Sequence, residues 1–424
     1  MTRSRGNLIL KPQNLLLLIF AIWAFAFPGA APRAENPNSE ERPYLILISL
    51  DGFRWDYPDR YPTPALDQLA ARGVRAKALR PVFPTLTFPN HYTIATGLYP
   101  ARHGLVANRF RDSETGEWFV HKQKDTAQDG HWYSGEPIWV AAEKAGLGAA
   151  AYFYVGTEAD IQGIRPRYWY SYNKKVDGMK RVRQVLKWLN LDAEDRPHLI
   201  TLYFEDVDDY SHWYGPDSEE NAAAVARVDS YLEALMAGVD NLPFADQVSI
   251  VVVSDHGQSS YQPDSKLLVL DELLDLSGTT SVDGGPYVFI YLDQAEPQRA
   301  AVIRDGINAV WNCGRAYLPE DSPAEWHVAG NSDFADVLVV AEPGCAVVSS
   351  LSSNTLLTPG DHGWAPETAD MQGIFIAAGP GLPKGVEVGT LRSVDLYPLL
   401  MRLLGLEPSP NVDSQPSELL NLLH

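Results

Sequence analysis

The chain has 424 residues, of which 45% are hydrophobic, and it carries a formal net charge of −20 at pH 7. This composition excludes global disorder, and the length exceeds the roughly 250–300 residues at which a single core tends to split or to acquire insertions. The negative charge opposes nonspecific binding to nucleic acid and to anionic membranes. We therefore expect a folded protein that has no nucleic-acid polymer as a partner.

The N-terminus has the pattern of a secretory signal peptide. A basic segment at residues 3–11 precedes the apolar stretch 15–27, and Gly29 and Ala31 provide small residues for a cut after position 31. The apolar stretch is shorter than the roughly 20 residues that a membrane-spanning helix needs. We predict a signal peptide at 1–31 and an exported protein, periplasmic or secreted, with no stable membrane insertion after signal removal. The alternative is an uncleaved N-terminal anchor.

Strand-like and helix-like segments alternate along the rest of the chain. Strands are recognised as continuous apolar runs, which are typical of buried parallel strands, and helices by apolar spacing and caps. In chain order we expect a strand at 44–50, a helix at 63–73, a helix at 138–144, a strand at 149–155, a helix at 176–189, a strand at 198–204, a helix at 219–235, a strand at 248–254, a strand at 374–378 and a helix at 394–404. This alternation predicts an α/β domain over residues 43–424, with a doubly wound, mostly parallel central sheet and helices on both faces.

The pattern changes between about residues 267 and 348, where we predict an inserted small subdomain. Short strand-like runs at 287–292 and 336–340 are separated there by Gly and Pro breaks. The two cysteines, Cys313 and Cys345, also fall in this segment. In an exported chain they form either one disulfide or two buried free thiols, because the sequence does not show their Cα separation.

Asp51, Asp255 and His256 are candidate metal ligands at the ends of predicted strands. Asp51 follows the strand at 44–50, and the other two follow the strand at 248–254. Ligands of open α/β sheets gather at the carboxyl ends of the strands, so we expect these side chains to lie together. The alternative for the Asp-His pair is a structural hydrogen bond in a loop.

Asp208, His212 and His362 are candidates for a second set. One helical turn places Asp208 and His212 on the same face, whereas Asp209 is expected to point away from His212. A lone histidine is a weak candidate, so His362 is proposed as a ligand only because it completes the set with Asp208 and His212. Asp361 is a candidate to orient the other ring nitrogen of His362. The alternative for the first two is a solvent-exposed helix pair.

Thr87 is the candidate nucleophile, in a loop that opens onto a helix-like run at 90–96. A threonine hydroxyl becomes a competent nucleophile when a bound metal lowers its pKa, and a helix N-terminus favours an anion. Thr85 and Thr93 compete for the role. Asn108 is either a hydrogen-bond donor to a phosphoryl oxygen or an ordinary turn residue.

Together these motifs resemble the nucleotide pyrophosphatase/phosphodiesterase family of the alkaline phosphatase superfamily, over about residues 43–404. The matching segments are Leu50–Arg54, Thr87–Tyr92, Gly97–Pro100 with His103–Gly104, Asn108, Asp208–His212 with Tyr214–Pro216, Ser254–Gly257 and His362–Gly363. Val207 and Ser211 stand where relatives often have Pro and Gly, and neither is a ligand. The sulfatase Cys-x-Pro-x-Arg motif is absent.

The resemblance implies two zinc ions per chain. One is held by Asp51, Asp255 and His256 and binds the hydroxyl of Thr87, and the other is held by a second set, which consists of Asp208, His212 and His362. It also implies a phosphothreonine intermediate that water hydrolyses. Related monoesterases carry a Lys/Arg pair, but the comparable stretch 155–163 is acidic, so we expect a preference for diesters over phosphate monoesters.

Aromatic residues are candidates for substrate binding. In nucleotide-cleaving relatives a Phe and Tyr residues at similar places clamp the base, which favours this role for Phe88 and Tyr203. For the cluster Tyr168, Trp169, Tyr170 and Tyr172, base stacking and a core position are equally favoured. The expected function is hydrolysis of nucleotide phosphodiester and pyrophosphate bonds to nucleoside 5′-monophosphates. The alternative is a choline-phosphodiester or lysophospholipid phosphodiesterase whose aromatics cage the headgroup. A non-catalytic zinc protein is disfavoured, and no oligomeric state is predicted.

Overall fold

The computed structural model of the protein describes residues 42–261, 267–352, 357–415 and 418–421. The predicted signal peptide at 1–31 lies outside these residues. Within the described ranges, no helix has both the length and the apolar character that crossing a membrane requires.

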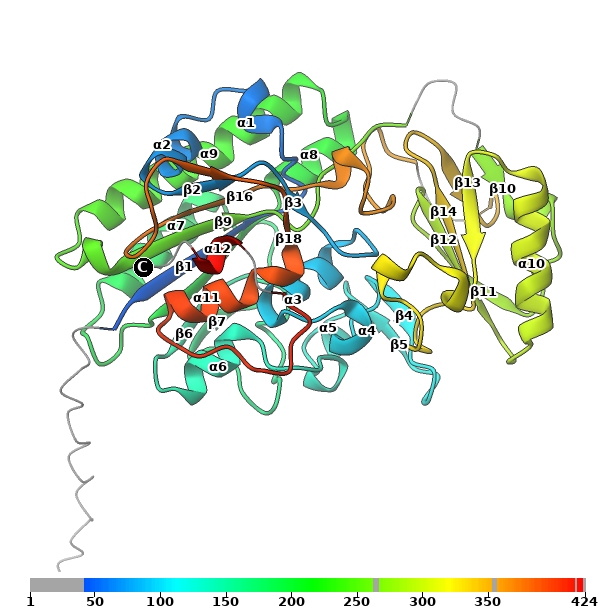
Figure 1. Cartoon of the computed structure of the whole chain (residues 1–424), viewed down its shortest axis with the longest axis horizontal. Coiled ribbons are helices and arrows are strands. Elements are labelled where there is room, and N and C mark those ends of the chain that lie inside the picture. The colour runs from blue at the N-terminus through cyan, green and yellow to red at the C-terminus, as the bar shows by residue number, and fades with distance from the viewer. Residues whose placement is uncertain (1–41, 262–266, 353–356, 416–417, 422–424) are drawn as a thin grey trace, which may run out of the picture. The chain divides into compact units, whose positions relative to one another are not determined.

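An eight-stranded sheet forms the centre of the fold (Figure 1), in the order β17-β2-β16-β9-β1-β8-β6-β7. Strand β16 is antiparallel to both of its neighbours, and the other pairs are parallel. The prediction of a mostly parallel α/β sheet is confirmed. The strands are β1 (Tyr44–Leu50), β2 (Val74–Ala76), β6 (Ala149–Tyr152), β7 (Tyr168–Tyr170), β8 (Leu199–Phe204), β9 (Val248–Val253), β16 (Phe375–Ala378) and β17 (Val386–Val388).

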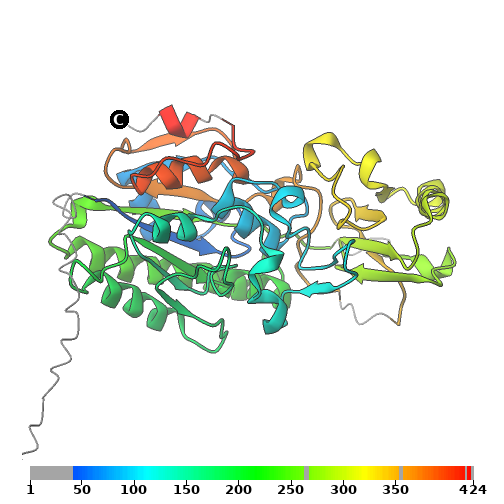
Figure 2. The same ribbon diagram turned by 90° about the horizontal axis from the view of Figure 1, so that it is seen from below.

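Helices cover both faces of this sheet. Successive residues of a strand point to opposite faces, so Leu45 and Leu47 of β1 pack with α3, α6 and α11, while Ile46 and Ile48 pack with α2, α7 and α9. Figure 2 shows the sheet between the two helical layers. The helices are α2 (Pro64–Arg72), α3 (Thr87–Thr96), α6 (Ile138–Lys144), α7 (Gly178–Leu189), α9 (Glu219–Asp240) and α11 (Tyr397–Leu403).

Several predicted boundaries differ from the structure. The strand expected at 149–155 ends at Tyr152, because Phe153 has a φ of 71° and turns the chain out of the extended conformation. Helix α9 continues to Asp240, since Met236 and Val239 extend its buried stripe. The helix expected at 394–404 is divided into a 3₁₀ turn and α11.

The segment 267–348 contains its own antiparallel sheet, in the order β11-β12-β14-β13, on which α10 packs. A disulfide joins Cys313 and Cys345, whose Cα atoms are 6.1 Å apart. The elements are β10 (Leu267–Val269), β11 (Thr279–Asp283), β12 (Tyr287–Leu292), α10 (Pro297–Val310), β13 (Gly314–Tyr317), β14 (Val337–Ala341) and β15 (Ala346–Val348). The remaining ones are α1 (Tyr57–Arg60), β3 (Leu79–Arg80), α4 (Pro100–His103), β4 (Arg109–Arg111), β5 (Trp118–Val120), α5 (Lys124–Ala127), α8 (Asp206–Tyr214), β18 (Leu391–Arg392) and α12 (Glu418–Asn421).

A buried ion pair fixes α7 to the end of β8. Both guanidinium Nη atoms of Arg181 donate to Glu205 at 2.6 Å, and Nη1 also donates to the carbonyl of Tyr203 at 2.7 Å. Arg181 is 1% exposed and Glu205 is 6% exposed. Because Glu205 directly precedes α8, this pair fixes the start of a helix that carries candidate ligands.

Replacing Arg181 with methionine is expected to lower the free energy of unfolding by about 3–5 kcal/mol, because Glu205 would remain buried without its partner. Urea unfolding followed by circular dichroism measures the loss. The double variant Arg181→Met/Glu205→Leu is the control and should recover most of it. Equal losses in the single and double variants would show that packing, rather than charge pairing, holds this junction.

Candidate active site

The strand ends bring Asp51 and Asp255 to one edge of the sheet. Parallel pairing sets Ser49 of β1 opposite Val253 of β9, so the two strands end at the same edge of the sheet. The amide of Gly52, the residue after Asp51, donates to Asp255 Oδ1 at 3.2 Å. Asp51 and Asp255 are each 1% exposed. The sheet therefore delivers two carboxylates into a buried position.

The first predicted set converges on the imidazole of His256. Its Nε2 lies 3.1 Å from Asp255 Oδ2, 3.5 Å from Asp51 Oδ1 and 3.4 Å from Thr87 Oγ1. Its Nδ1 faces the carbonyl of Gly257 at 3.0 Å, which leaves Nε2 for a ligand. Asp51 Oδ1 is buried and accepts no hydrogen bond from any described residue, and Asp255 Oδ2 faces the ring nitrogens of His256 and, at 3.2 Å, His91. Burying a carboxylate oxygen costs free energy unless a cation lies beside it. The residues of this set therefore fit a metal ion.

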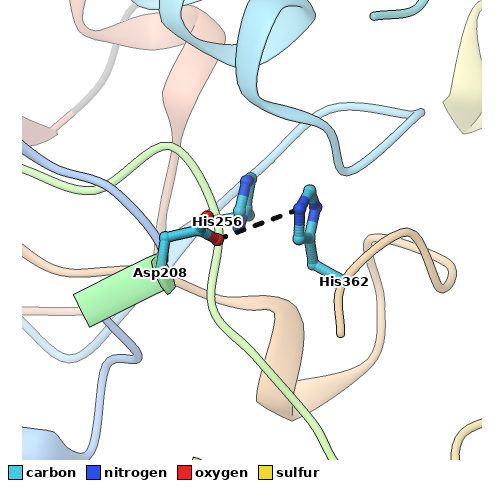
Figure 3. Close-up of side chains that lie close together, drawn as sticks. All are labelled: Asp208, His256 and His362. Carbon is cyan, nitrogen blue, oxygen red and sulfur yellow. Dashed lines mark ion pairs between the residues drawn. The ribbon is translucent and has the colours of Figure 1, made fainter. Parts of the chain in front are cut away.

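The second predicted set converges on Asp208 Oδ1. His212 Nε2, one turn further along α8, lies 3.5 Å from this oxygen, and His362 Nε2 lies 3.9 Å from it. Figure 3 shows Asp208 and His362 with His256, which belongs to the first set, so the two sets adjoin. The Nδ1 atoms face backbone carbonyls, at 2.9 Å from Gly360 for His212 and at 2.8 Å from Thr85 for His362.

The expected role of Asp361 is wrong. The carbonyl of Thr85, not Asp361, meets the other ring nitrogen of His362. Asp361 Oδ1 accepts from the backbone amide of His362 at 2.9 Å, and Oδ2 accepts from the hydroxyl of Tyr261 at 2.7 Å. A short side chain reaches the adjacent amide more readily than the ring beyond it, which explains the difference.

The electrostatics of the site suit cation binding. Burial, together with the charges of Asp255 and Asp208, raises the pKa of Asp51 well above its usual value. Burial and the neighbouring imidazoles hold the pKa of His362 well below its usual value, so its ring is neutral and offers a lone pair. A divalent cation would relieve the repulsion among these carboxylates and would use that lone pair.

Thr87 is the first residue of α3, whereas the sequence placed it in a loop before a helix at 90–96. The helix begins earlier because a proline, Pro89, fits within its first turn, where its missing N–H has no intrahelical acceptor. The carbonyl of Thr87 faces Nδ1 of His91 at 2.9 Å, and Ser49 Oγ lies 2.7 Å from the other ring nitrogen. His91 therefore holds the backbone of the candidate nucleophile.

The side chain of Asn108 binds the backbone next to Thr87. Its Oδ1 accepts from the backbone amide of Phe88 at 2.9 Å, which leaves the Nδ2 hydrogens to the cavity that Asn108 lines. Two other contacts were not expected from the sequence. The hydroxyl of Tyr203 donates to Asp51 Oδ2 at 2.5 Å, and the amide of Gln258 donates to Asp208 Oδ1. Neither residue type in isolation signals such a contact.

A cavity of about 590 Å³ opens over the two sets. Three of the predicted aromatics, Phe88, Tyr172 and Tyr203, line it, and Tyr168, Trp169 and Tyr170 do not. Tyr172 is 43% exposed, whereas Tyr203 is 8% exposed and its hydroxyl is bound to Asp51. Phe88 and Tyr172 therefore offer most of the aromatic surface.

Polar residues that the sequence analysis missed line the same cavity. They are His121, Lys122, Lys124, Gln128, Glu158 and Lys174. Glu158 accepts from Gln128 and Ser171 at 2.6 and 2.8 Å and from the backbone amide of Tyr172 at 2.5 Å. Lys174 Nζ pairs with Asp209 Oδ1 at 2.7 Å. The basic run at 121–124 was the one available signal, because the other contacts join distant segments.

The fold and the two sets of Asp and His side chains define an α/β metallohydrolase. Residues 45–365 match the type I phosphodiesterase/nucleotide pyrophosphatase family, and the chain belongs to this family. The family consists of hydrolases that depend on metal ions. The family prediction from the sequence is thus confirmed.

Individual relatives are similar in sequence to this chain over most of its length. It is 33% identical over 413 residues to an uncharacterized pyrophosphatase/phosphodiesterase of Schizosaccharomyces pombe, covering 93% of this chain and 84% of the relative. It is 32% identical over 386 residues to the bis(5′-adenosyl)-triphosphatase of Xenopus laevis, covering 89% of this chain and 81% of the relative. Human ectonucleotide pyrophosphatase/phosphodiesterase family member 1 is 33% identical over 385 residues, but the chain spans only 41% of its length.

Solved structures are similar as well. Murine ectonucleotide pyrophosphatase/phosphodiesterase 5 has a TM-score of 0.83 and 30% identity, with 90% of this chain and all of that chain covered. The same values hold for its inactive variant, in which alanine replaces a threonine, in complex with AMP.

Proposed function

We propose that the protein is a zinc-dependent phosphodiesterase/pyrophosphatase that hydrolyses nucleotide phosphodiester and pyrophosphate bonds to nucleoside 5′-monophosphates. Asp51, Asp255, His256 and the hydroxyl of Thr87 would hold one Zn²⁺. The second Zn²⁺ would be held by Asp208, His212 and His362. The convergence of each set within 3.1–3.9 Å, together with the buried, unpartnered Oδ1 of Asp51, supports these assignments. Imidazole and carboxylate donors are ordinary zinc ligands.

In this proposal Thr87 Oγ1 attacks the phosphorus and forms a phosphothreonine, while the bond to the leaving oxygen breaks. Water then hydrolyses the phosphothreonine and releases the nucleoside 5′-monophosphate. The bound ions would lower the pKa of the hydroxyl and stabilise the developing negative charge. Asn108 Nδ2 would donate to a phosphoryl oxygen, and His91 holds the Thr87 backbone in position.

The lining of the cavity favours a nucleotide over a choline phosphodiester, and this observation carries the proposal. Phe88 and Tyr172 offer aromatic surface for a base, and Lys122 and Lys124 would repel a choline headgroup. The carboxylates outside the ligand sets already have partners. Glu158 accepts from the hydroxyl of Ser171, Asp209 is paired with Lys174, and Glu205 is paired with Arg181. The AMP complex of the murine relative supports the same choice.

The wild-type enzyme is expected to cleave the p-nitrophenyl ester of thymidine 5′-monophosphate with a kcat/KM at least about 100-fold above that for p-nitrophenyl phosphate. The reason is that no Lys or Arg in the stretch 155–163 meets the extra charge of a monoester. Release of nitrophenolate measures both rates. Glycerophosphocholine serves as the competing substrate, assayed by choline release. A higher kcat/KM for p-nitrophenyl phosphate or for glycerophosphocholine would contradict the proposal.

We also propose that the protein is exported, to the periplasm or to the medium, and acts there on small nucleotides. The human relative, family member 1, is by its name an ectoenzyme. The disulfide between Cys313 and Cys345 fits an oxidising compartment.

A further inference from the structure

A second groove, of about 300 Å³, adjoins the catalytic cavity, and we call it the basic groove. It lies between strand β7 and helix α7, and Phe153 and Ser171 line both the groove and the cavity. The segment 170–174 forms the wall between them. Tyr170 and Asn173 line the groove, whereas Tyr172 and Lys174 line the cavity.

The groove is positively charged in a strongly acidic chain. Lys180, Arg183 and Lys187 line it, and their spacing places them along one exposed face of α7. No Asp or Glu is among its lining residues, and none of the three cations forms an ion pair within the described part of the chain. Asp177, at the start of the helix, accepts from the backbone amide of Lys180 at 3.2 Å instead. In a protein of net charge −20, three unpaired cations in one groove indicate an anionic ligand.

An aromatic ring completes the groove. Tyr170 lies on β7, the edge strand of the central sheet, and is 42% exposed. Its ring is supported from behind, with centroids 4.7 Å from Tyr152 and 5.9 Å from Trp188. Cations combined with a supported aromatic ring are typical of surfaces that bind phosphate chains bearing bases.

We propose that the basic groove is a second anion subsite, which binds the phosphate groups of a substrate that extends beyond the nucleotide held at Thr87. This inference rests on the proposed function. The shared ligand chemistry is a chain of phosphate oxyanions. It occurs in the polyphosphate bridge of a dinucleoside polyphosphate and in the backbone of a short single-stranded oligonucleotide. The small ester of thymidine monophosphate would fill only the catalytic cavity.

The test is the triple variant Lys180→Gln/Arg183→Gln/Lys187→Gln, which keeps good helix formers at exposed positions of α7. Its kcat/KM is expected to fall about tenfold for diadenosine tetraphosphate or for a thymidine tetranucleotide, mostly through KM. The salt dependence of that kcat/KM should also weaken, because fewer phosphates are neutralised. Turnover of the p-nitrophenyl ester should stay within about twofold, since none of the three groove cations lines the catalytic cavity.

The matched control is Lys77→Gln/Lys384→Gln/Arg402→Gln, which removes the same three charges from exposed positions outside the groove. A loss limited to one extended substrate identifies which phosphate chain the groove binds. Equal losses on extended and small substrates, or in the groove variant and the control, would overturn the proposal.

Binding to catalytically inactive protein separates this inference from the proposed function. In a Thr87→Ala background, the Kd of the tetranucleotide should rise about tenfold when the three groove cations are replaced. An unchanged Kd would overturn the groove proposal even if turnover were normal. Absence of wild-type turnover together with the expected change in Kd would instead refute the proposed reaction and leave the groove standing.

Discussion

Replacing Thr87 with alanine is expected to lower kcat by about 10⁴-fold or more, because the hydroxyl that attacks the phosphorus is removed. Its Oγ1 lies 3.4 Å from His256 Nε2, beside the carboxylates of Asp51 and Asp255. The Kd for AMP should change little, since the aromatic surface and Asn108 remain. Steady-state assays with the nitrophenyl ester and calorimetric titration with AMP measure the two quantities.

Two other hydroxyl variants make this test specific. Thr87→Ser keeps a nucleophile and should retain measurable turnover. Thr85→Val removes the hydroxyl that donates to the carbonyl of Trp364 at 2.7 Å but keeps the backbone carbonyl that meets His362. It should therefore retain most of the activity. Turnover by Thr87→Ala near the wild-type rate, or its loss only in Thr85→Val, would remove Thr87 from the role of nucleophile.

The parts of the fold that depend on local patterns could be predicted from the sequence. Strands β1 and β9 are fully buried, so they appear as unbroken apolar runs, and the polar residues that follow them mark the sheet edge. Asp208 and His212 share a helix face at a fixed spacing, and α8 has that spacing. Each of these inferences uses residues that are neighbours in the chain or that end adjacent parallel strands.

Contacts between distant segments could not be predicted in this way. The carbonyl of Thr85 meets His362 across 277 positions, and a carbonyl carries no side-chain signature. Tyr172 lies in the cavity while Tyr170 does not, although regular strand alternation would place residues two apart on the same face. The reason is that β7 ends at Tyr170, so Tyr172 lies beyond the regular strand. The sequence shows the composition of that aromatic cluster, but the direction of each ring depends on how β7 joins the sheet edge.

Replacing Asp51 with asparagine is expected to abolish metal-dependent turnover and, at the same time, to stabilise the metal-free protein by about 1–2 kcal/mol. Asp51 Oδ1 is buried without a partner among the described residues, and Asp255 and Asp208 repel its charge. A neutral amide relieves that repulsion, and its oxygen can still accept from the hydroxyl of Tyr203. Thermal unfolding in chelator and in excess Zn²⁺ measures the effect.

The order of stabilities should reverse when zinc is added, because the wild type gains about 4 kcal/mol at a free metal concentration near 1,000 times its Kd and the variant gains less. Asp229 provides the control. It is 4% exposed but accepts from the backbone amides of Ala65 and Leu66 at 3.1 and 2.9 Å, so Asp229→Asn should destabilise the protein with or without metal. If Asp51→Asn also destabilised the metal-free protein, Asp51 would be a structural carboxylate, and the assignment of the first zinc site would fail.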